Sequence, residues 1–173
     1  MSAGVEPADL GSPAADAGRP VIAVRAAAPA DTAEVIRLAA LMYEAMGIDA
    51  SGGPWREAAR AGLAARLGAD VAVFVAEEAA ADGRLAAAGA GSITRRLPGP
   101  ANPGGRAGYI QWVSTDPRWR RRGLACQITI ALLGWFAANQ VLAVELHATS
   151  QAESLYRSLG FGPGPYPGLR IRL

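Results

Sequence analysis

An arginine-rich stretch that leads into an apolar helix constrains this chain more than any other feature. The residues from Val113 to Ile128 read VSTDPRWRRRGLACQI, with a turn signal at Asp116-Pro117 between a β-branched strand end and the apolar segment. A helix start has unpaired backbone N–H groups and the positive end of the helix dipole. The arginines add positive charge, and small residues such as Gly123 let a ligand approach the backbone. The stretch therefore predicts a pyrophosphate site over residues 120–126.

Two other interpretations of the same stretch remain open at this point. It is also consistent with an exposed basic turn that caps a helix, or with a nucleic-acid patch, because arginine runs neutralise phosphates. The formal net charge of the chain is only +2. A charge of this size does not require a nucleic-acid or membrane partner, and we expect neither.

Length and composition point to one folded domain behind a short leader. A chain of 173 residues suits a single domain. Cys126 and His147 are the sole cysteine and histidine, so we expect no internal disulfide and no metal site. Residues 1–20 are rich in Ala, Gly, Pro and Asp and predict a disordered leader, which leaves 21–173 as the domain. Without a secretory signal or a membrane-length apolar run, a soluble cytoplasmic protein is the default expectation.

Hydrophobic periodicity predicts the element order β-α-α-β-β-β-α-β-α-β. Capping-box patterns at 31–34 and 150–153 predict two helix starts, and Met42 and Met46 are expected to pack in the core. Gly89-x-Gly91 predicts a bulge or close packing inside a strand. The expected strands lie near 21–25, 71–75, 85–95, 109–115, 141–146 and 169–173. This order predicts an α/β (α+β) fold with a mixed central sheet and helices on both faces.

Two motifs in this order resemble the GNAT superfamily of N-acetyltransferases. Arg120-x-x-Gly123-x-Ala125 resembles its acetyl-CoA-binding motif, and Tyr156-x-x-x-Gly160-Phe161 resembles its last helix. The resemblance covers about residues 21–173. It implies a single GNAT-like domain, acetyl-CoA as co-substrate, and transfer of the acetyl group to a primary amine by direct attack.

The resemblance also implies roles for individual residues. Val113 would offer its backbone N–H to the thioester oxygen, and Thr115 would hold the pantetheine arm through its backbone. Thr149 stands where the family often has an asparagine, and its hydroxyl retains one of the hydrogen bonds of that amide. The other implied cofactor contacts are Arg120, Arg121, Arg122, Gly123, Leu124, Ala125 and Cys126.

The chemistry needs a proton donor for the leaving thiolate and a proton acceptor for the amine. Tyr156 is the candidate acid, because a phenol with a pKa of roughly 10 keeps its proton at neutral pH. Many relatives have a carboxylate as base at a position that is Tyr109 here, with Gln111 next on the same face. We therefore predict proton removal through water held by Tyr109 and Gln111. His147 on the neighbouring strand is the proton sink, and Glu145 is expected deeper in a structural role.

The acceptor amine is not identified by any motif. We expect it between the loops 47–54, 97–108 and 164–168, with Trp55, Trp112 and Tyr166 as candidate walls. No acidic cluster marks a strongly cationic acceptor, so small amines, amino acids, aminoglycosides and protein amines remain open. A non-catalytic acyl-CoA-binding module or sensor is the alternative function. The missing carboxylate favours this alternative, and Tyr156 argues against it. The family resemblance also makes a homodimer possible, although no seam is identifiable.

Overall fold

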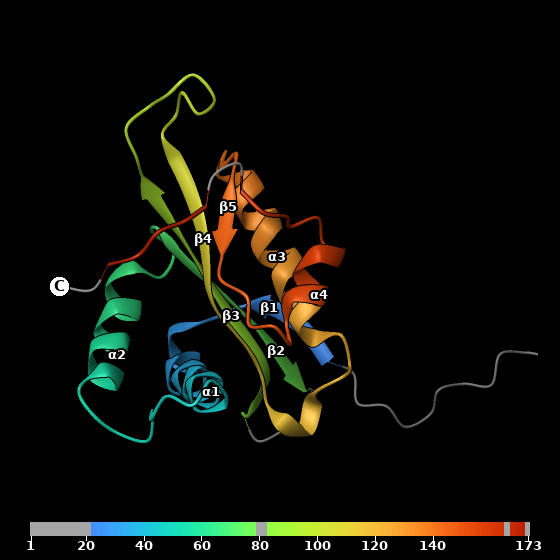
Figure 1. Cartoon of the computed structure of the whole chain (residues 1–173). Coiled ribbons are helices and arrows are strands. Elements are labelled where there is room, and N and C mark those ends of the chain that lie inside the picture. Colours follow the sequence, from blue (N-terminus) through green and yellow to red (C-terminus); the bar gives the residue numbers. More distant parts are fainter. Residues whose placement is uncertain (1–21, 79–82, 165–166, 172–173) are drawn as a thin grey trace, which may run out of the picture.

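The alternating apolar segments form five strands within the residues described by the structure, a computed structural model covering 22–78, 83–164 and 167–171 (Figure 1). They are β1 (Ile22–Ala26), β2 (Val71–Glu78), β3 (Leu85–Arg95), β4 (Arg106–Thr115) and β5 (Val144–Leu146), in the spatial order β1-β2-β3-β4-β5. Consecutive strands from β1 to β4 pair antiparallel, whereas β4 and β5 pair parallel. The predicted mixed sheet is confirmed.

Helices cover both faces of this sheet. One core cluster joins α1 (Thr32–Ala45) and α2 (Trp55–Arg66) to the sheet through residues such as Leu38, Leu63 and Val73. A second cluster joins α3 (Leu124–Ala138) to the opposite face through Ile128 and Phe136. The short helix α4 (Glu153–Ser158) follows β5, and Figure 1 shows it on the same side as α3. In the described ranges, no helix is long and apolar enough to cross a bilayer.

Two glycines of β3 allow α3 to lie close to the sheet. A Cβ atom at Gly89 would clash with the side chain of Ile128, and one at Gly91 would lie 2.8 Å from the Phe136 ring. The register between β3 and β4 also shifts between Ala90 and Gly91. Both the close packing and the bulge predicted for this stretch are therefore present.

Several predicted details of the ends of elements are wrong. Asp31 directly precedes α1, but its carboxylate accepts from the Ala28 N–H and pairs with Arg25 instead of capping the helix. The first residue of α4 follows Ala152, and no side chain caps that helix among the described residues. Asp31 pairs with Arg25 and Glu153 pairs with Arg157, so these two carboxylates have partners other than the cap.

The last two predicted strands also differ from the structure. β5 is shorter than the predicted 141–146 and lies at the edge of the described sheet. Residues 169–171 form no strand. The predicted leader, Asp82, Tyr166 and the last two residues lie outside the described part of the chain.

Candidate active site

β4 and β5 pair only over a short stretch, and this opens an edge of the sheet. The pairs are Gly108 with Val144, Tyr109 with Glu145 and Ile110 with Leu146. Beyond them β4 continues to Thr115 without a β5 partner in the described chain. An unpaired strand edge presents backbone N–H and C=O groups to whatever lies beside it. The second half of β4 therefore offers unpaired backbone groups that can form hydrogen bonds with a ligand.

A bulge at Gln111 decides which N–H groups face that open edge. Ala90 pairs with Trp112 and Gly91 with Ile110, so Gln111 is the extra residue. Before the bulge, the Gly108 N–H donates to Ala143 on the β5 side, whereas after it the Asp116 N–H donates to Ala86 on the β3 side. N–H groups alternate sides along a strand. Counting back from Asp116, the N–H groups of Val113 and Thr115 face the open edge.

A groove of about 520 Å³ follows this edge. Its walls come from the end of α1, from β4 and from the segment between β5 and α4. Four predicted cofactor residues, Val113, Thr115, Arg120 and Thr149, line it together. Met42 and Met46 also line the groove, and Met46 is half exposed. Their prediction as core residues is wrong, because their helical spacing indicates a face of α1 but not what that face contacts.

The predicted pyrophosphate loop is a turn that opens directly into α3. Arg121 and Gly123 have φ angles of 64° and 75°, in the left-handed region, and Gly123 immediately precedes the helix. A Cβ atom added at Gly123 would meet no described atom within 4 Å, so open space lies above the helix start. Leu124 is buried, while Ala125 and Cys126 are partly exposed. Exposed N–H groups at a helix start, with space above them, fit a phosphate.

The arginines of this loop differ in what they contact. The Nε of Arg120 lies 3.4 Å from the Thr115 carbonyl oxygen, which keeps this side chain beside the groove. Arg122 lies over the Trp119 ring, with its Cζ 4.6 Å from the ring centroid. Arg121 is exposed. The contacts of Arg120 and Arg122 therefore differ, and only Arg120 of the three lines the groove.

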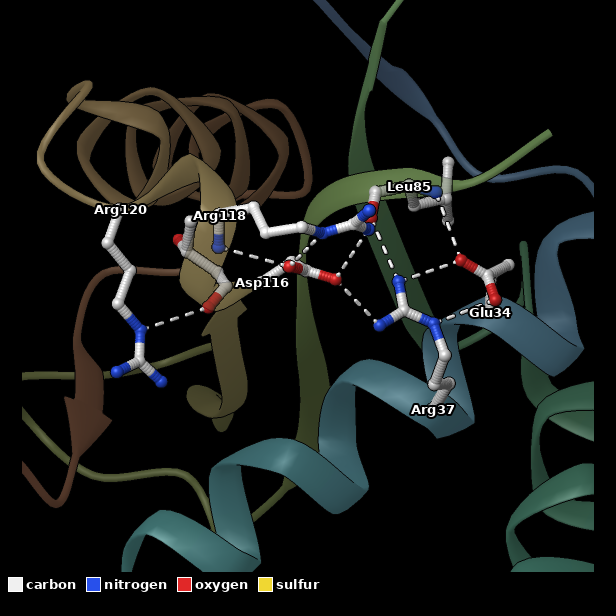
Figure 2. Close-up of polar contacts among 7 residues, drawn as sticks. Glu34, Arg37, Leu85, Asp116, Arg118 and Arg120 are labelled. Atoms are coloured by element: carbon white, nitrogen blue, oxygen red, sulfur yellow. Dashed lines mark hydrogen bonds and ion pairs between the residues drawn. The ribbon is translucent and has the colours of Figure 1, made fainter. Parts of the chain in front are cut away.

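Asp116 ties this loop to α1 through ion pairs that Figure 2 shows. Its carboxylate accepts from Arg37 Nη1 at 2.9 Å and from Arg118 Nε at 3.1 Å. Arg37 in turn bonds Glu34 and the Leu85 carbonyl. The hydrogen bond from Arg118, and then that from Arg37, lower the pKa of the buried Asp116 carboxyl to about 2. The sequence indicated only a turn at Asp116. The ion pair with Arg37 could not be predicted, because the two residues are 79 positions apart in the chain.

A second hollow of about 480 Å³ adjoins the groove, and we call it the acceptor cavity. It shares Met42, Met46, Val113, Thr149 and Ala152 with the groove, so Val113 lies at their junction. The cavity also brings together the predicted catalytic residues Tyr109, His147 and Tyr156, with Gln111. The rest of its lining is Tyr43, Ile48, Trp112, Ala148 and Arg170.

The titratable groups of the cavity occupy distinct environments. Tyr156 is buried, packs edge-on against Phe161, and its burial raises the pKa of the phenol above 10.0. The Tyr109 hydroxyl lies 2.8 Å from His147 Nδ1. Glu145 is not deep: its side chain is 55 % exposed and pairs with Arg96. The deeper placement predicted for Glu145 is therefore wrong.

Part of the predicted acceptor site is wrong, because several of the predicted walls do not line the cavity. Trp112 lines the cavity and donates to the Tyr43 hydroxyl at 3.0 Å. Trp55 lies behind Tyr43, with ring centroids 5.7 Å apart, and does not line it. The 97–108 loop and the described residues of 164–168 do not line it either. Instead, the C-terminal segment contributes Arg170.

The sheet, its open β4 edge and the basic helix start are features expected of an acetyltransferase. The model of the "Acetyltransferase (GNAT) family" matches residues 38–161, and the chain belongs to this family. The chain is similar to glucosamine 6-phosphate N-acetyltransferase 1 of Oryza sativa subsp. japonica, with 36% identity over 97 residues. That match covers 56% of each chain, so the chain spans little more than half the length of this curated relative.

Solved structures show the same fold. A predicted acetyltransferase from Clostridium acetobutylicum, solved with acetyl-CoA, has a TM-score of 0.76 at 20% identity over 87% of this chain and 96% of its own. Glucosamine-6-phosphate N-acetyltransferase from Arabidopsis thaliana has a TM-score of 0.69 at 19% identity, over 87% and 98%. At such identities the likeness establishes the fold and leaves the acceptor open.

Proposed function

We propose that this chain is an acetyl-CoA-dependent N-acetyltransferase that acetylates a primary amine by direct attack. The observation that carries the proposal is the position of Val113, whose N–H faces the open β4 edge where the groove meets the acceptor cavity. A fixed N–H at this point stabilises negative charge as it develops on a carbonyl oxygen. Acetyl-CoA supplies the acetyl thioester, and the groove leads from the helix start to Val113.

The residues along the groove fit the parts of that co-substrate. Arg120, Arg121, Arg122 and the N–H groups from Gly123 to Cys126 hold the pyrophosphate, because they combine arginine charge with the helix start. The N–H of Thr115 and the side chain of Thr149 hold the pantetheine arm along the edge of β4.

Tyr156 and the Tyr109–His147 pair divide the proton transfers. The protonated phenol of Tyr156 donates to the leaving sulfur, and its raised pKa keeps it protonated throughout the neutral range. The Tyr109 hydroxyl accepts the amine proton and passes its own proton to His147 Nδ1. An alkyl amine with a pKa of roughly 10 is neutral in about one molecule in a thousand at pH 7, a handicap near 4 kcal/mol. An acceptor that is a weaker base, such as an amino sugar, reduces this handicap.

The test is an acetylation screen with the purified protein, read by thiol release and product mass. The amine panel holds glucosamine 6-phosphate, which the name of the rice relative suggests, together with small amines, amino acids, an aminoglycoside and a peptide. We expect thiol release that matches the acetylated amine formed. Acetyl-CoA binding in calorimetry without thiol release from any amine would favour the acyl-CoA-binding module instead.

A further inference from the structure

We infer that the acceptor carries an anionic group, a phosphate or a carboxylate, in addition to its amine, and that Arg170 binds it. The inference rests on the proposed N-acetyl transfer and names the substrate class of that site. Arg170 lines the same cavity as Tyr109, His147 and Tyr156, the residues proposed to move protons. An acceptor whose amine lies beside Tyr109 therefore lies in a cavity that Arg170 also lines.

The charge of the cavity is one-sided. Of the described residues that line it, Arg170 carries a permanent positive charge and none is an aspartate or glutamate. Of the carboxylates in the adjoining segments, Glu145 pairs with Arg96 and Glu153 pairs with Arg157, and neither Glu44 nor Asp49 lines the cavity. A ligand with a single ammonium group and no anion would meet an arginine without a balancing charge. A polycationic acceptor would be repelled more strongly.

The chemistry of arginine makes an oxyanion the matching partner. The planar guanidinium presents donors in a fork that fits two oxygens of a carboxylate or phosphate. Such a pair is strengthened where surrounding apolar surface excludes water. Met42, Ile48 and Trp112 supply apolar surface in the same cavity, and Arg170 is itself exposed, so a bound acceptor would have to cover the pair.

The size and construction of the cavity agree with a small acceptor that has two functional groups. Its volume of about 480 Å³ is in the range of small-molecule sites. In Figure 1 the red C-terminal segment, residues 167–171, runs from the region of β4 towards α2. It thereby brings Arg170 to a cavity whose other walls come from α1, β4, α4 and the segment between β5 and α4. Among the acceptors that the sequence left open, amino acids are favoured over aminoglycosides. Amino-sugar phosphates carry the same combination of amine and anion.

The experiment compares paired acceptors that differ in the anionic group. Glucosamine is paired with glucosamine 6-phosphate, and propylamine with β-alanine, so the two pairs separate phosphate from carboxylate. The ratio of kcat/KM within each pair is measured for wild type, Arg170→Gln, Arg170→Lys and the control Arg95→Gln. Arg95 is an exposed arginine at the end of β3 that does not line the cavity.

We expect wild type to prefer the anionic member of at least one pair by about tenfold or more, the size of one charge-assisted hydrogen bond. Arg170→Gln should lose most of this ratio through the KM of the anionic member. Arg170→Lys should restore part of it, because charge remains but the fork is lost. Arg95→Gln should keep the wild-type ratio. A ratio that survives in Arg170→Gln, or a wild-type preference for the neutral members, overturns the inference while leaving N-acetyl transfer intact.

A failure of the proposed function itself has a different signature. In that case no amine in either pair releases thiol from acetyl-CoA. Binding of glucosamine 6-phosphate, β-alanine and inorganic phosphate, measured by calorimetry in the presence of CoA, then tests the arginine directly. Affinity for at least one of the three that falls about tenfold in Arg170→Gln supports the anion site. Affinity that does not depend on Arg170, or no binding of any of them, overturns it.

Discussion

The Tyr109 hydroxyl and His147 Nδ1 lie 2.8 Å apart and join β4 to the end of β5 inside the acceptor cavity. The parallel pairing of Tyr109 with Glu145 brings His147 alongside, because residues two apart on a strand lie on the same face. The contact connects a hydroxyl that can reach the amine to an imidazole that can take up a proton. It offers a route for proton removal at a position where many relatives have a carboxylate.

The first prediction tests this route through the pH dependence of kcat/KM. His147→Gln should lower kcat/KM by about 100-fold at neutral pH, the usual size of general-base assistance. It should also abolish the acid limb that His147 causes, so that the remaining limb follows the acceptor amine. Glu145→Gln is the control, because Glu145 is exposed and does not line the cavity. Identical acid limbs and similar rates in wild type and His147→Gln would exclude His147 as the base.

The second prediction concerns Tyr156 as the proton donor. Tyr156→Phe keeps the ring and its edge-on contact with Phe161 but removes the hydroxyl. We expect kcat to fall by about 100-fold or more while the KM for acetyl-CoA changes little, because the proton is needed in the transition state. The melting temperature should be retained, which separates chemistry from packing. A variant with wild-type turnover would leave Tyr156 a packing residue.

The third prediction tests the loop that precedes α3. Gly123→Val adds a β-branched side chain at a φ of +75°, in open space above the helix start. Gly68→Val is a matched control, because Gly68 has a φ of +82°, a Cβ added there would also meet no described atom within 4 Å, and Gly68 follows α2 instead of preceding α3. Both variants should lose a similar stability of about 1–2 kcal/mol. Calorimetry should show a loss of CoA affinity of about tenfold or more for Gly123→Val alone. Equal CoA affinities would contradict the phosphate site.

The fourth prediction concerns the ion pair between Asp116 and Arg37. Asp116→Asn should lower the free energy of unfolding by about 1–3 kcal/mol at pH 7, because it removes the buried carboxylate that Arg37 and Arg118 share and leaves Arg37 with Glu34 as its charged partner. The pKa of Asp116 falls from 3.8 to about 2 on folding, so its contribution is full above pH 3.8 and is lost as pH falls towards 2. Urea unfolding at pH 7 and pH 3 should therefore show a smaller difference between wild type and variant at pH 3.

A matched comparison separates this pair from ordinary surface charge. Asp70 pairs with Arg66 at 2.7 Å, but both side chains are 46% exposed. Asp70→Asn should change stability little, because solvent screens exposed pairs. The Asp116 carboxylate also accepts from the backbone N–H of Arg118, just before the predicted pyrophosphate loop, and we expect this bond to position the loop. Asp116→Asn should therefore also weaken CoA binding. Equal effects of the two variants on stability and CoA affinity would contradict that role.

Local patterns were sufficient for the order of the elements from β1 to α4 and for the identity of the family. Two such patterns are the alternation of Val71, Val73 and Val75 in β2 and the presence of Gly68 just after α2. Each involves neighbouring residues only, so it can be recognised without knowing which segment packs against it. The same holds for the spacing of Arg120, Gly123 and Ala125, which describes a loop entering a helix. Local signals failed at Asp31 and at α4, where polar side chains had alternatives to capping.

The site itself depended on contacts between distant segments. A bulge at Gln111 turned the Val113 N–H towards the open edge, and bulges depend on strand pairing. Met42 and Met46 border the groove because β4 and β5 separate opposite the end of α1. Arg37 reaches Asp116, and Arg170 reaches the acceptor cavity, across chain separations that no periodicity encodes. Sequence spacing specifies which residues share a face of one element, whereas the packing of elements against one another selects what that face meets.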